Sequence, residues 1–369
     1  MGRLQSFAIS KSVIKIFMLS FFQIIGLHFF SKKLLLKKLK ILLNTEGYTF
    51  TPQFSGRVAL QNLIQYFSSE MESSRCLYLP DYICNVVFKA SEIVDANRII
   101  YPTDVRCEPV LSFLKRAIRK KKVGIIVLAS IFGSSALLKL LNREKVRKFI
   151  EKENIKIILD LCQDISLLKH VPISKNIGVI ISFNNKSFPG LMGGGILYHD
   201  KLKFHEKSLP VGKKLKLYYI LLRDIKLKYF LRRPAFVGKS YDYSRCVHFP
   251  YTFDNYKLSK IQFILAICGI KKINIYLRNK IDTINLYKKE IIKTFFYETS
   301  PYLILANPRF RKELNRKYKL SYAKHNDPKN TYKDITIIHN KGFDDFYSKN
   351  FSEPSPENSY SQITSTLKS

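Results

Sequence analysis

Short apolar runs alternate with longer amphipathic stretches between about residues 55 and 200. The apolar runs are almost continuous in Ile, Val and Leu, which is typical of strands buried on both faces of a sheet. We expect strands at 75–79, 98–101, 123–130, 155–159 and 177–183. We expect helices between them, at 58–69, 82–93, 108–120 and 137–153. This alternation predicts an α/β fold with a mostly parallel sheet flanked by helices, and ligands bound beyond the carboxyl ends of the strands.

The whole chain divides into four regions by composition. A hydrophobic and basic segment at 1–45 precedes a large α/β domain at 46–245. Residues 246–350 begin with a helical and basic pattern, and the family resemblance described below implies a helical segment and a small C-terminal domain there. The clearest helical patterns beyond residue 200 are Lys213–Leu231 and Leu258–Phe296. The last residues, 351–369, are rich in serine and proline, which predicts a disordered tail.

The N-terminal segment has two interpretations. Residues 16–30 are uncharged apart from His28, and the next ten residues are rich in lysine and leucine. The apolar run falls short of the roughly 20 residues that a membrane-spanning helix needs. The segment either lies on an anionic membrane surface or packs as a helix on the protein's own core or a partner subunit. No small-residue cleavage site follows the run, which argues against a removed signal peptide.

Composition and charge narrow the class of protein. With 46% apolar residues among 369, the chain can build a sizeable core, which excludes disorder along its whole length. The 63 Lys and Arg against 28 Asp and Glu leave a net charge of +35, spread along the chain without a nucleic-acid-binding motif. We therefore expect a basic surface but no specific nucleic-acid partner. Six scattered cysteines without a CxxC pair or zinc-like spacing predict free thiols in the cytoplasm and no metal site.

Two candidate sites follow from residues at element ends. Ser55-Gly56-Arg57 opens the helix at 58–69, where backbone N–H groups and the helix dipole favour a phosphate, although a simple N-cap explains Ser55 equally. Asp160 ends the strand at 155–159, and Gln163 follows three residues later. A carboxylate there must be paired, either with a cationic ring nitrogen or as the cap of a local turn.

Two further candidates lie in loops beyond strands. Lys186 follows the strand at 177–183 and precedes three consecutive glycines, 193–195, which allow close backbone approach. A lysine held away from water has a lowered pKa and can form a Schiff base with an aldehyde, whereas a surface lysine has no chemical role. The loop at 80–85 follows the strand at 75–79 and offers a flat side chain that could cover a ring.

Taken in order, these motifs resemble one family. An SGR-x-AL helix start, an LPDYIC loop, a strand ending in D-x-x-Q and an SF-x-x-K segment before a GGG turn are similar to the fold-type I pyridoxal-phosphate (PLP) enzymes. Within these enzymes, the pattern resembles in particular the DegT/DnrJ/EryC1/StrS family of sugar aminotransferases. The resemblance covers about residues 50–200 and continues more weakly through 258–262 and Arg278. It implies a fold-type I PLP-transferase with a small α+β C-terminal domain.

The resemblance also implies a role for each candidate residue. Lys186 would be the catalytic lysine that holds pyridoxal 5'-phosphate, and Asp160 would pair with the pyridinium nitrogen so that the ring acts as an electron sink. Gln163 would contact the phenolic oxygen of the cofactor. The remaining cofactor-binding positions would be Ser55, Gly56, Arg57, Tyr82, Cys84 and Ser182.

Three features depart from the family pattern. The family has one more residue between Phe183 and Lys186, and Cys84 stands where a stacking aromatic is usual, with Tyr82 as the substitute. The hydrophobic N-terminus is not a family feature. The shortened lysine motif and the N-terminus favour an alternative in which a catalytically inactive relative serves as a membrane-associated or scaffolding protein of polysaccharide assembly. The presence of Lys186, Asp160 and Gln163 opposes this alternative.

The resemblance predicts an aminotransferase that moves an amino group from an amino acid to a nucleotide-linked keto sugar. We expect glutamate to be the amino donor. Such a reaction would serve surface polysaccharide or amino-sugar biosynthesis. The resemblance implies a homodimer, and the basic surface suits a nucleotide diphosphate. We expect a cytoplasmic protein, with peripheral contact to the inner face of an anionic membrane if the N-terminal segment binds lipid.

Overall fold

Most of the α/β domain is described by the computed structural model of the chain. The described residues are 26–43, 47–72, 74–81, 83, 85–92, 97–103, 108–120, 123–130, 136–162, 164–183, 193–215, 254–271, 294–295, 302–305 and 336–339. Among them, no helix is long and apolar enough to cross a membrane.

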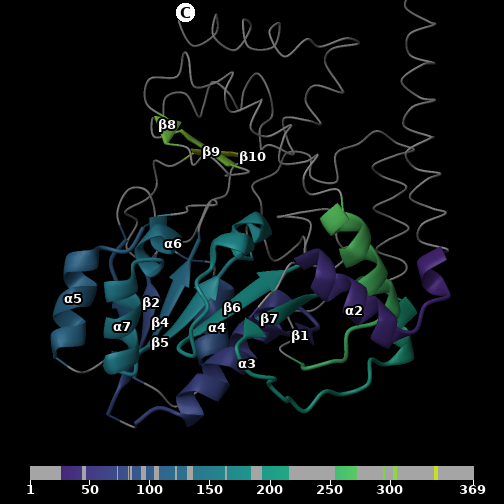
Figure 1. The fold of residues 1–369 in the computed structure, drawn as a ribbon, viewed down its shortest axis with the longest axis horizontal. Helices are drawn as coiled ribbons and strands as arrows, with labels where there is room; N and C mark the ends of the chain where they lie inside the picture. The colour runs from purple at the N-terminus through teal and green to yellow at the C-terminus, as the bar shows by residue number, and fades with distance from the viewer. Residues whose placement is uncertain are drawn as a thin grey trace, which may run out of the picture.

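The domain is built on a 7-stranded sheet in the order β1-β7-β6-β5-β4-β2-β3 (Figure 1). Its neighbouring pairs from β3 to β6 are parallel, whereas β7 is antiparallel to both β6 and β1. The strands are β1 (Thr49–Gln53), β2 (Cys76–Pro80), β3 (Arg98–Tyr101), β4 (Val123–Ala129), β5 (Lys156–Asp160), β6 (Ile177–Ser182) and β7 (Gly194–Tyr198). The prediction of a mostly parallel sheet with these five parallel strands is confirmed.

Helices cover both faces of this sheet (Figure 1). One face packs against α3 (Gly56–Ser69), whose Leu63 and Phe67 are completely buried, and α4 (Asn85–Ser91) lies beside it. A Cβ at Gly178 of β6 would lie only 2.8 Å from Leu63 Cδ2, so α3 rests directly on the strand. The helices that contribute buried residues to the other face are α2 (Lys32–Leu43), α5 (Leu111–Arg119), α6 (Ala136–Leu141), α7 (Glu144–Lys152), the 3-10 helix η2 (Ile165–His170) and a helix at 260–271.

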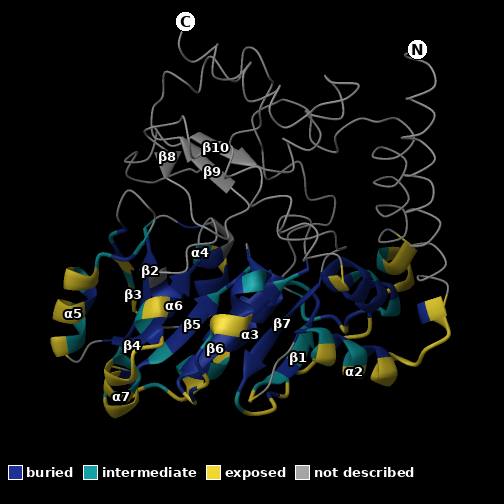
Figure 2. Cartoon of the chain, turned by 45° about the horizontal axis from the view of Figure 1, so that its top comes forward, coloured by how far each residue is buried: buried dark blue, intermediate teal, exposed yellow. Residues whose placement is uncertain are grey.

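Both faces of the central strands are buried, which explains their unbroken apolar sequences. β4 and β2 are buried at every position, and alternate residues of β4 point into the two cores. Ile125 and Val127 join the α3 side, whereas Ile126 and Leu128 join the other. Figure 2 shows the buried strands in the middle of the domain and the exposed residues on the outer surfaces of the helices. Each fully buried aliphatic side chain contributes about 1.5–3 kcal/mol to folding.

Two expectations about elements were wrong, and one strand was not predicted. The segment 137–153 forms two helices, because the Asn142 side chain donates to the Leu138 carbonyl (2.9 Å) and the His170 carbonyl (2.8 Å) and so ends α6. The expected helix at 258–296 begins at 260, and Thr294–Phe295 is strand β8. The sequence pattern also missed β1, in which Pro52 interrupts the strand signal. Proline is tolerated there because β1 is at the edge of the sheet.

A second, smaller sheet lies in the C-terminal part of the chain. It consists of three antiparallel strands in the order β10-β9-β8. β9 spans Tyr302–Leu305 and β10 spans Thr336–His339. These strands agree with the α+β character expected of the C-terminal region, while the domain boundaries stay a prediction.

The described part of the N-terminal segment packs on the protein's own core. Leu35, Leu39 and Leu43 of α2 are buried in the same cluster as Ile264 of the helix at 260–271. The Lys32 ammonium donates to the Leu258 carbonyl at 3.2 Å, and burial together with neighbouring lysines lowers its pKa. For 26–43, the packed helix is therefore the correct interpretation of how the segment is anchored. Residues 1–25 lie outside the described residues.

Candidate functional site

The predicted site residues converge at the carboxyl ends of β5 and β6. Asp160 is the last residue of β5 and pairs in register with Ile180 of β6, two residues before Ser182. The start of α3 lies against the same edge of the sheet, because Gly56 is in contact distance of Ser182. Three segments far apart in the sequence therefore meet where parallel sheets bind ligands.

The start of α3 has the geometry of a capped helix N-terminus. Ser55 is extended (φ −158°, ψ 164°), and its Oγ accepts a hydrogen bond from the Val58 N–H at 3.2 Å. The N-cap interpretation of Ser55 is thus confirmed. It is compatible with anion binding, because the other N–H groups of a first helical turn have no carbonyl partner within the helix.

Gly56 is packed so closely against its neighbours that there is no room for a side chain at this position. A Cβ on Gly56 would lie 2.7 Å from Cys162 Sγ and 2.9 Å from Ser182 Cβ. Contacts this short do not occur between real atoms, so any larger residue would displace its neighbours. The hydroxyl of Ser182 and the thiol of Cys162 consequently flank the first turn of α3.

Gly193, just before β7, and Gly194, its first residue, allow the close backbone approach that the sequence predicted. Gly193 has a left-handed backbone (φ +107°) and forms a bridge with Ser55. A Cβ on Gly194 would lie 2.4 Å from the Ile181 carbonyl oxygen and 2.7 Å from the Gly56 nitrogen. The close approach of β7 to α3 and β6 therefore needs glycine at both positions.

Asp160 is partly buried and has a defined local partner. Its Oδ1 accepts a hydrogen bond from the Cys162 N–H at 2.8 Å, and its carbonyl accepts one from the Ser130 N–H at 3.0 Å. The turn-capping role considered for Asp160 is therefore real. It fixes the carboxylate at the edge of the sheet, next to Cys162 and so close to the start of α3.

A second carboxylate anchors the loop that follows β2. Asp81 Oδ1 accepts hydrogen bonds from the Thr103 N–H (3.0 Å) and the Thr103 hydroxyl (2.6 Å). These bonds join the carboxyl ends of β2 and β3. They fix the start of the loop that the sequence singled out as a cover for a ring.

The structure brings together five of the nine predicted site residues. Ser55, Gly56, Arg57, Asp160 and Ser182 lie at the shared edge just described, whereas Tyr82, Cys84, Gln163 and Lys186 lie outside the described residues. Sequence reasoning missed Cys162 and Thr103. Cys162 stands two residues after Asp160, so its place at the strand end was a usable signal, but its contact with Gly56 is long-range and required the fold.

The chain resembles known proteins in its structure and not detectably in its sequence. No protein-family model and no curated protein sequence matches the chain. Among solved structures, the aminotransferase PseC of Helicobacter pylori, involved in pseudoaminic acid biosynthesis, is similar with a TM-score of 0.60 and 14% identity. The similarity covers 95% of this chain and 96% of that one.

Two further solved structures have the same architecture. A Streptococcus pneumoniae protein assigned as a sugar aminotransferase, in its PLP form, has a TM-score of 0.56 at 15% identity, over 95% of this chain and 96% of that one. A DegT DnrJ EryC1 StrS aminotransferase from Brucella abortus has a TM-score of 0.55 at 14% identity, over 90% and 88%. These structures share the fold that the sequence motifs predicted. The chain has the fold of the fold-type I PLP-dependent aminotransferases.

Proposed function

We propose that this protein is a PLP-dependent aminotransferase of the sugar-modifying type. The observation that carries the proposal is the meeting of Gly56, Ser182 and Asp160 at one edge of the sheet. The order of sequence motifs and the structural relatives, which include sugar aminotransferases, support the same activity.

The residues at the start of α3 fit the phosphate of the cofactor. Gly56 is buried and lets Ser182 pack directly against the first turn, which places the Ser182 hydroxyl beside the helix N-terminus. The positive end of the helix dipole favours a dianionic phosphate. Ser55, Gly56, Arg57 and Ser182 would hold this group.

The carboxylate and the lysine would have separate tasks. Asp160, held by the Cys162 N–H, would keep a ring nitrogen protonated by pairing with it. Lys186 would bind the cofactor's aldehyde through its amine and move the proton between the donor's α-carbon and the ring system. When bound, the cofactor supplies an electron sink for the carbanion that forms at that carbon. Gln163, Tyr82 and Cys84 would contact the ring.

The proposal also covers the substrates of the reaction and the oligomeric state of the protein. We expect glutamate as amino donor and a nucleotide-linked keto sugar as acceptor, for surface polysaccharide or amino-sugar biosynthesis. The net charge of +35 supports binding of a diphosphate, because lysine and arginine both pair with phosphate oxygens. The protein is proposed to act in the cytoplasm as a homodimer.

One sequence feature favours a second candidate, a catalytically inactive relative with a scaffolding role. Only two residues separate Phe183 from Lys186, one fewer than in the family pattern. An absorbance experiment separates the two functions. An aminotransferase incubated with pyridoxal phosphate and then freed of unbound cofactor by gel filtration should be yellow, lose that colour on addition of glutamate, and regain it with a keto sugar. A scaffolding protein should stay colourless, which would overturn the enzymatic proposal.

A further inference from the structure

Residues 29–41 expose a concentration of large apolar side chains. Phe29 is 85% exposed, Ile41 69% and Leu34 44%. Elsewhere in the described residues, exposed side chains of this kind occur singly or in pairs. Large apolar residues grouped on one exposed surface usually mark an interaction site.

The helical geometry of α2 separates this surface from the side that packs on the core. Leu35, Leu39 and Leu43 recur on the buried face. The opposite face carries four exposed residues, which are Lys33, Leu34, Lys37 and Ile41. Because the buried face is anchored to the domain, α2 cannot turn its outer face inward.

The charge on this surface has one sign. Within residues 26–43 there is no Asp or Glu but there are five lysines, all in α2. Lysines next to exposed aromatic and aliphatic side chains are the composition of helices that lie in the interface of an anionic membrane. The lysines reach lipid phosphates while the apolar side chains enter the boundary with the acyl chains.

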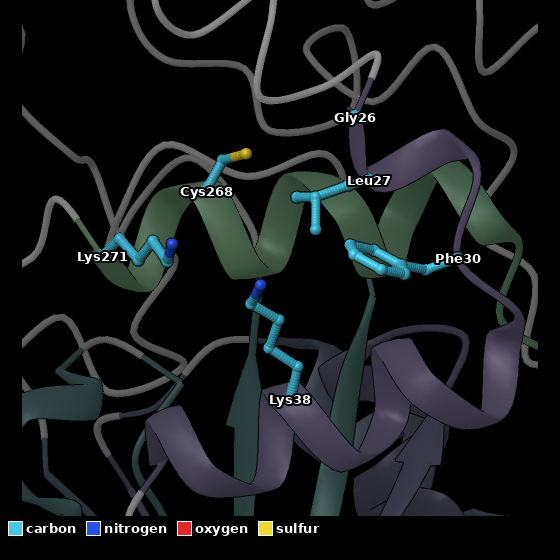
Figure 3. A pocket seen from close by; sticks show the side chains of 6 residues that line it. All are labelled: Gly26, Leu27, Phe30, Lys38, Cys268 and Lys271. Atoms are coloured by element: carbon cyan, nitrogen blue, oxygen red, sulfur yellow. The ribbon is translucent and has the colours of Figure 1, made fainter.

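A cavity of about 230 Å³ lies between residues 26–30, α2 and the helix at 260–271 (Figure 3). Leu27, Phe30 and Cys268 line it, and Lys38 and Lys271 direct their side chains to its edge. The Lys38 ammonium also lies 5.4 Å from the centre of the Phe30 ring. The cavity therefore combines apolar walls with two lysines, the same side-chain types that the outer face of α2 exposes.

We propose that the outer face of α2, formed by Lys33, Leu34, Lys37 and Ile41, docks the protein on an anionic lipid surface together with the exposed Phe29 of the turn before the helix. A second copy of the chain is disfavoured as the occupant, because a symmetric contact would place the same lysines opposite each other. This inference is independent of the proposed enzymatic activity, since none of these residues belongs to the site at the ends of β5 and β6.

The test uses full-length protein and sedimentation with vesicles of phosphatidylcholine containing phosphatidylglycerol, against phosphatidylcholine alone. Lys33→Glu/Lys37→Glu should lower partitioning to the anionic vesicles at least about tenfold, and Phe29→Ser/Ile41→Ser should lower it several-fold. The matched controls are Lys145→Glu/Lys152→Glu and Phe149→Ser on α7, at the other end of the domain (Figure 2). They change exposed residues of the same types and should leave partitioning unchanged.

Two outcomes would overturn the proposal. Unchanged sedimentation of both α2 variants would assign any vesicle binding to another part of the chain. Altered oligomeric mass of these variants in light scattering, with vesicle binding intact, would make the face a contact between copies. Circular dichroism and cofactor colour equal to those of the unmodified protein show that the variants are folded, so loss of binding supports the membrane contact even if the enzymatic proposal fails.

Discussion

Gly56 and Ser182 are separated by 126 positions in the sequence, yet a Cβ on Gly56 would lie 2.9 Å from Ser182 Cβ and 3.3 Å from Ser182 Oγ. The contact brings the first turn of α3 against the end of β6. It makes the proposed phosphate site dependent on the absence of a side chain at one position.

Gly56→Ala tests this contact directly. The added methyl group must push Cys162 or Ser182 aside, which should cost about 1–3 kcal/mol in the free energy of unfolding and weaken cofactor retention. Urea denaturation and a titration of visible absorbance with pyridoxal phosphate measure the two effects. Gly212→Ala is the control, because nothing lies within 4 Å of the added atom. Unaltered stability and cofactor affinity of the Gly56→Ala variant would contradict the tight cradle.

Two substitutions of Asp160 separate the effect of its negative charge from the effect of its turn-capping hydrogen bond. Asp160→Asn keeps an oxygen for the Cys162 N–H but removes the negative charge, so it should retain stability and lose turnover and cofactor affinity. Asp160→Ala should lose both, with a stability cost of about 1 kcal/mol for the hydrogen bond. Turnover of the Asp160→Asn variant at the level of the unmodified protein would reduce Asp160 to a turn-capping residue.

Lys186 decides between the enzymatic and scaffolding functions. If its amine binds the cofactor, borohydride should fix the label to the peptide that contains Lys186, and Lys186→Ala should abolish visible absorbance and amino transfer together. Lys175→Ala is the control, since Lys175 is an exposed lysine outside the site. Label on a different lysine would leave the fold in place and remove the catalytic assignment.

Tyr101 gives the stability a defined dependence on pH. Its hydroxyl donates to the Val127 carbonyl at 2.7 Å, and complete burial, with a smaller effect of Asp81, raises its pKa well above 10. The unfolded side chain titrates near pH 10, so above that pH the unfolded state binds fewer protons and is favoured. The stabilising contribution is present below about pH 10 and decreases as pH rises further.

Tyr101→Phe should therefore lower the free energy of unfolding by about 1–2 kcal/mol at neutral pH, through the lost hydrogen bond. The same variant should show a shallower decline at alkaline pH than the unmodified protein. Denaturant titrations from about pH 8 to about pH 11 check both slopes. Parallel slopes would mean that Tyr101 does not control this decline.

The sequence by itself determined which segments form the central sheet. β2, β4, β5 and β6 are recognisable because burial on both faces requires almost every residue to be apolar, a local pattern that needs no knowledge of neighbours. It also located Asp160 and Ser182 at strand ends, and the carboxyl ends of parallel strands necessarily share an edge.

The tertiary structure decided the features that depend on distant partners. β1 contains Pro52 and lacks a strong strand pattern, so its pairing with β7 comes from long-range hydrogen bonds. The side of α2 that faces the core could not be separated from a membrane-facing side by sequence, because leucines and lysines occur around the helix. Only the contact of Leu35 and Leu39 with the domain distinguishes the two. The contact between Cys162 and Gly56 was also not predictable, because a local sequence pattern indicates whether a residue is buried but not which distant residue it touches.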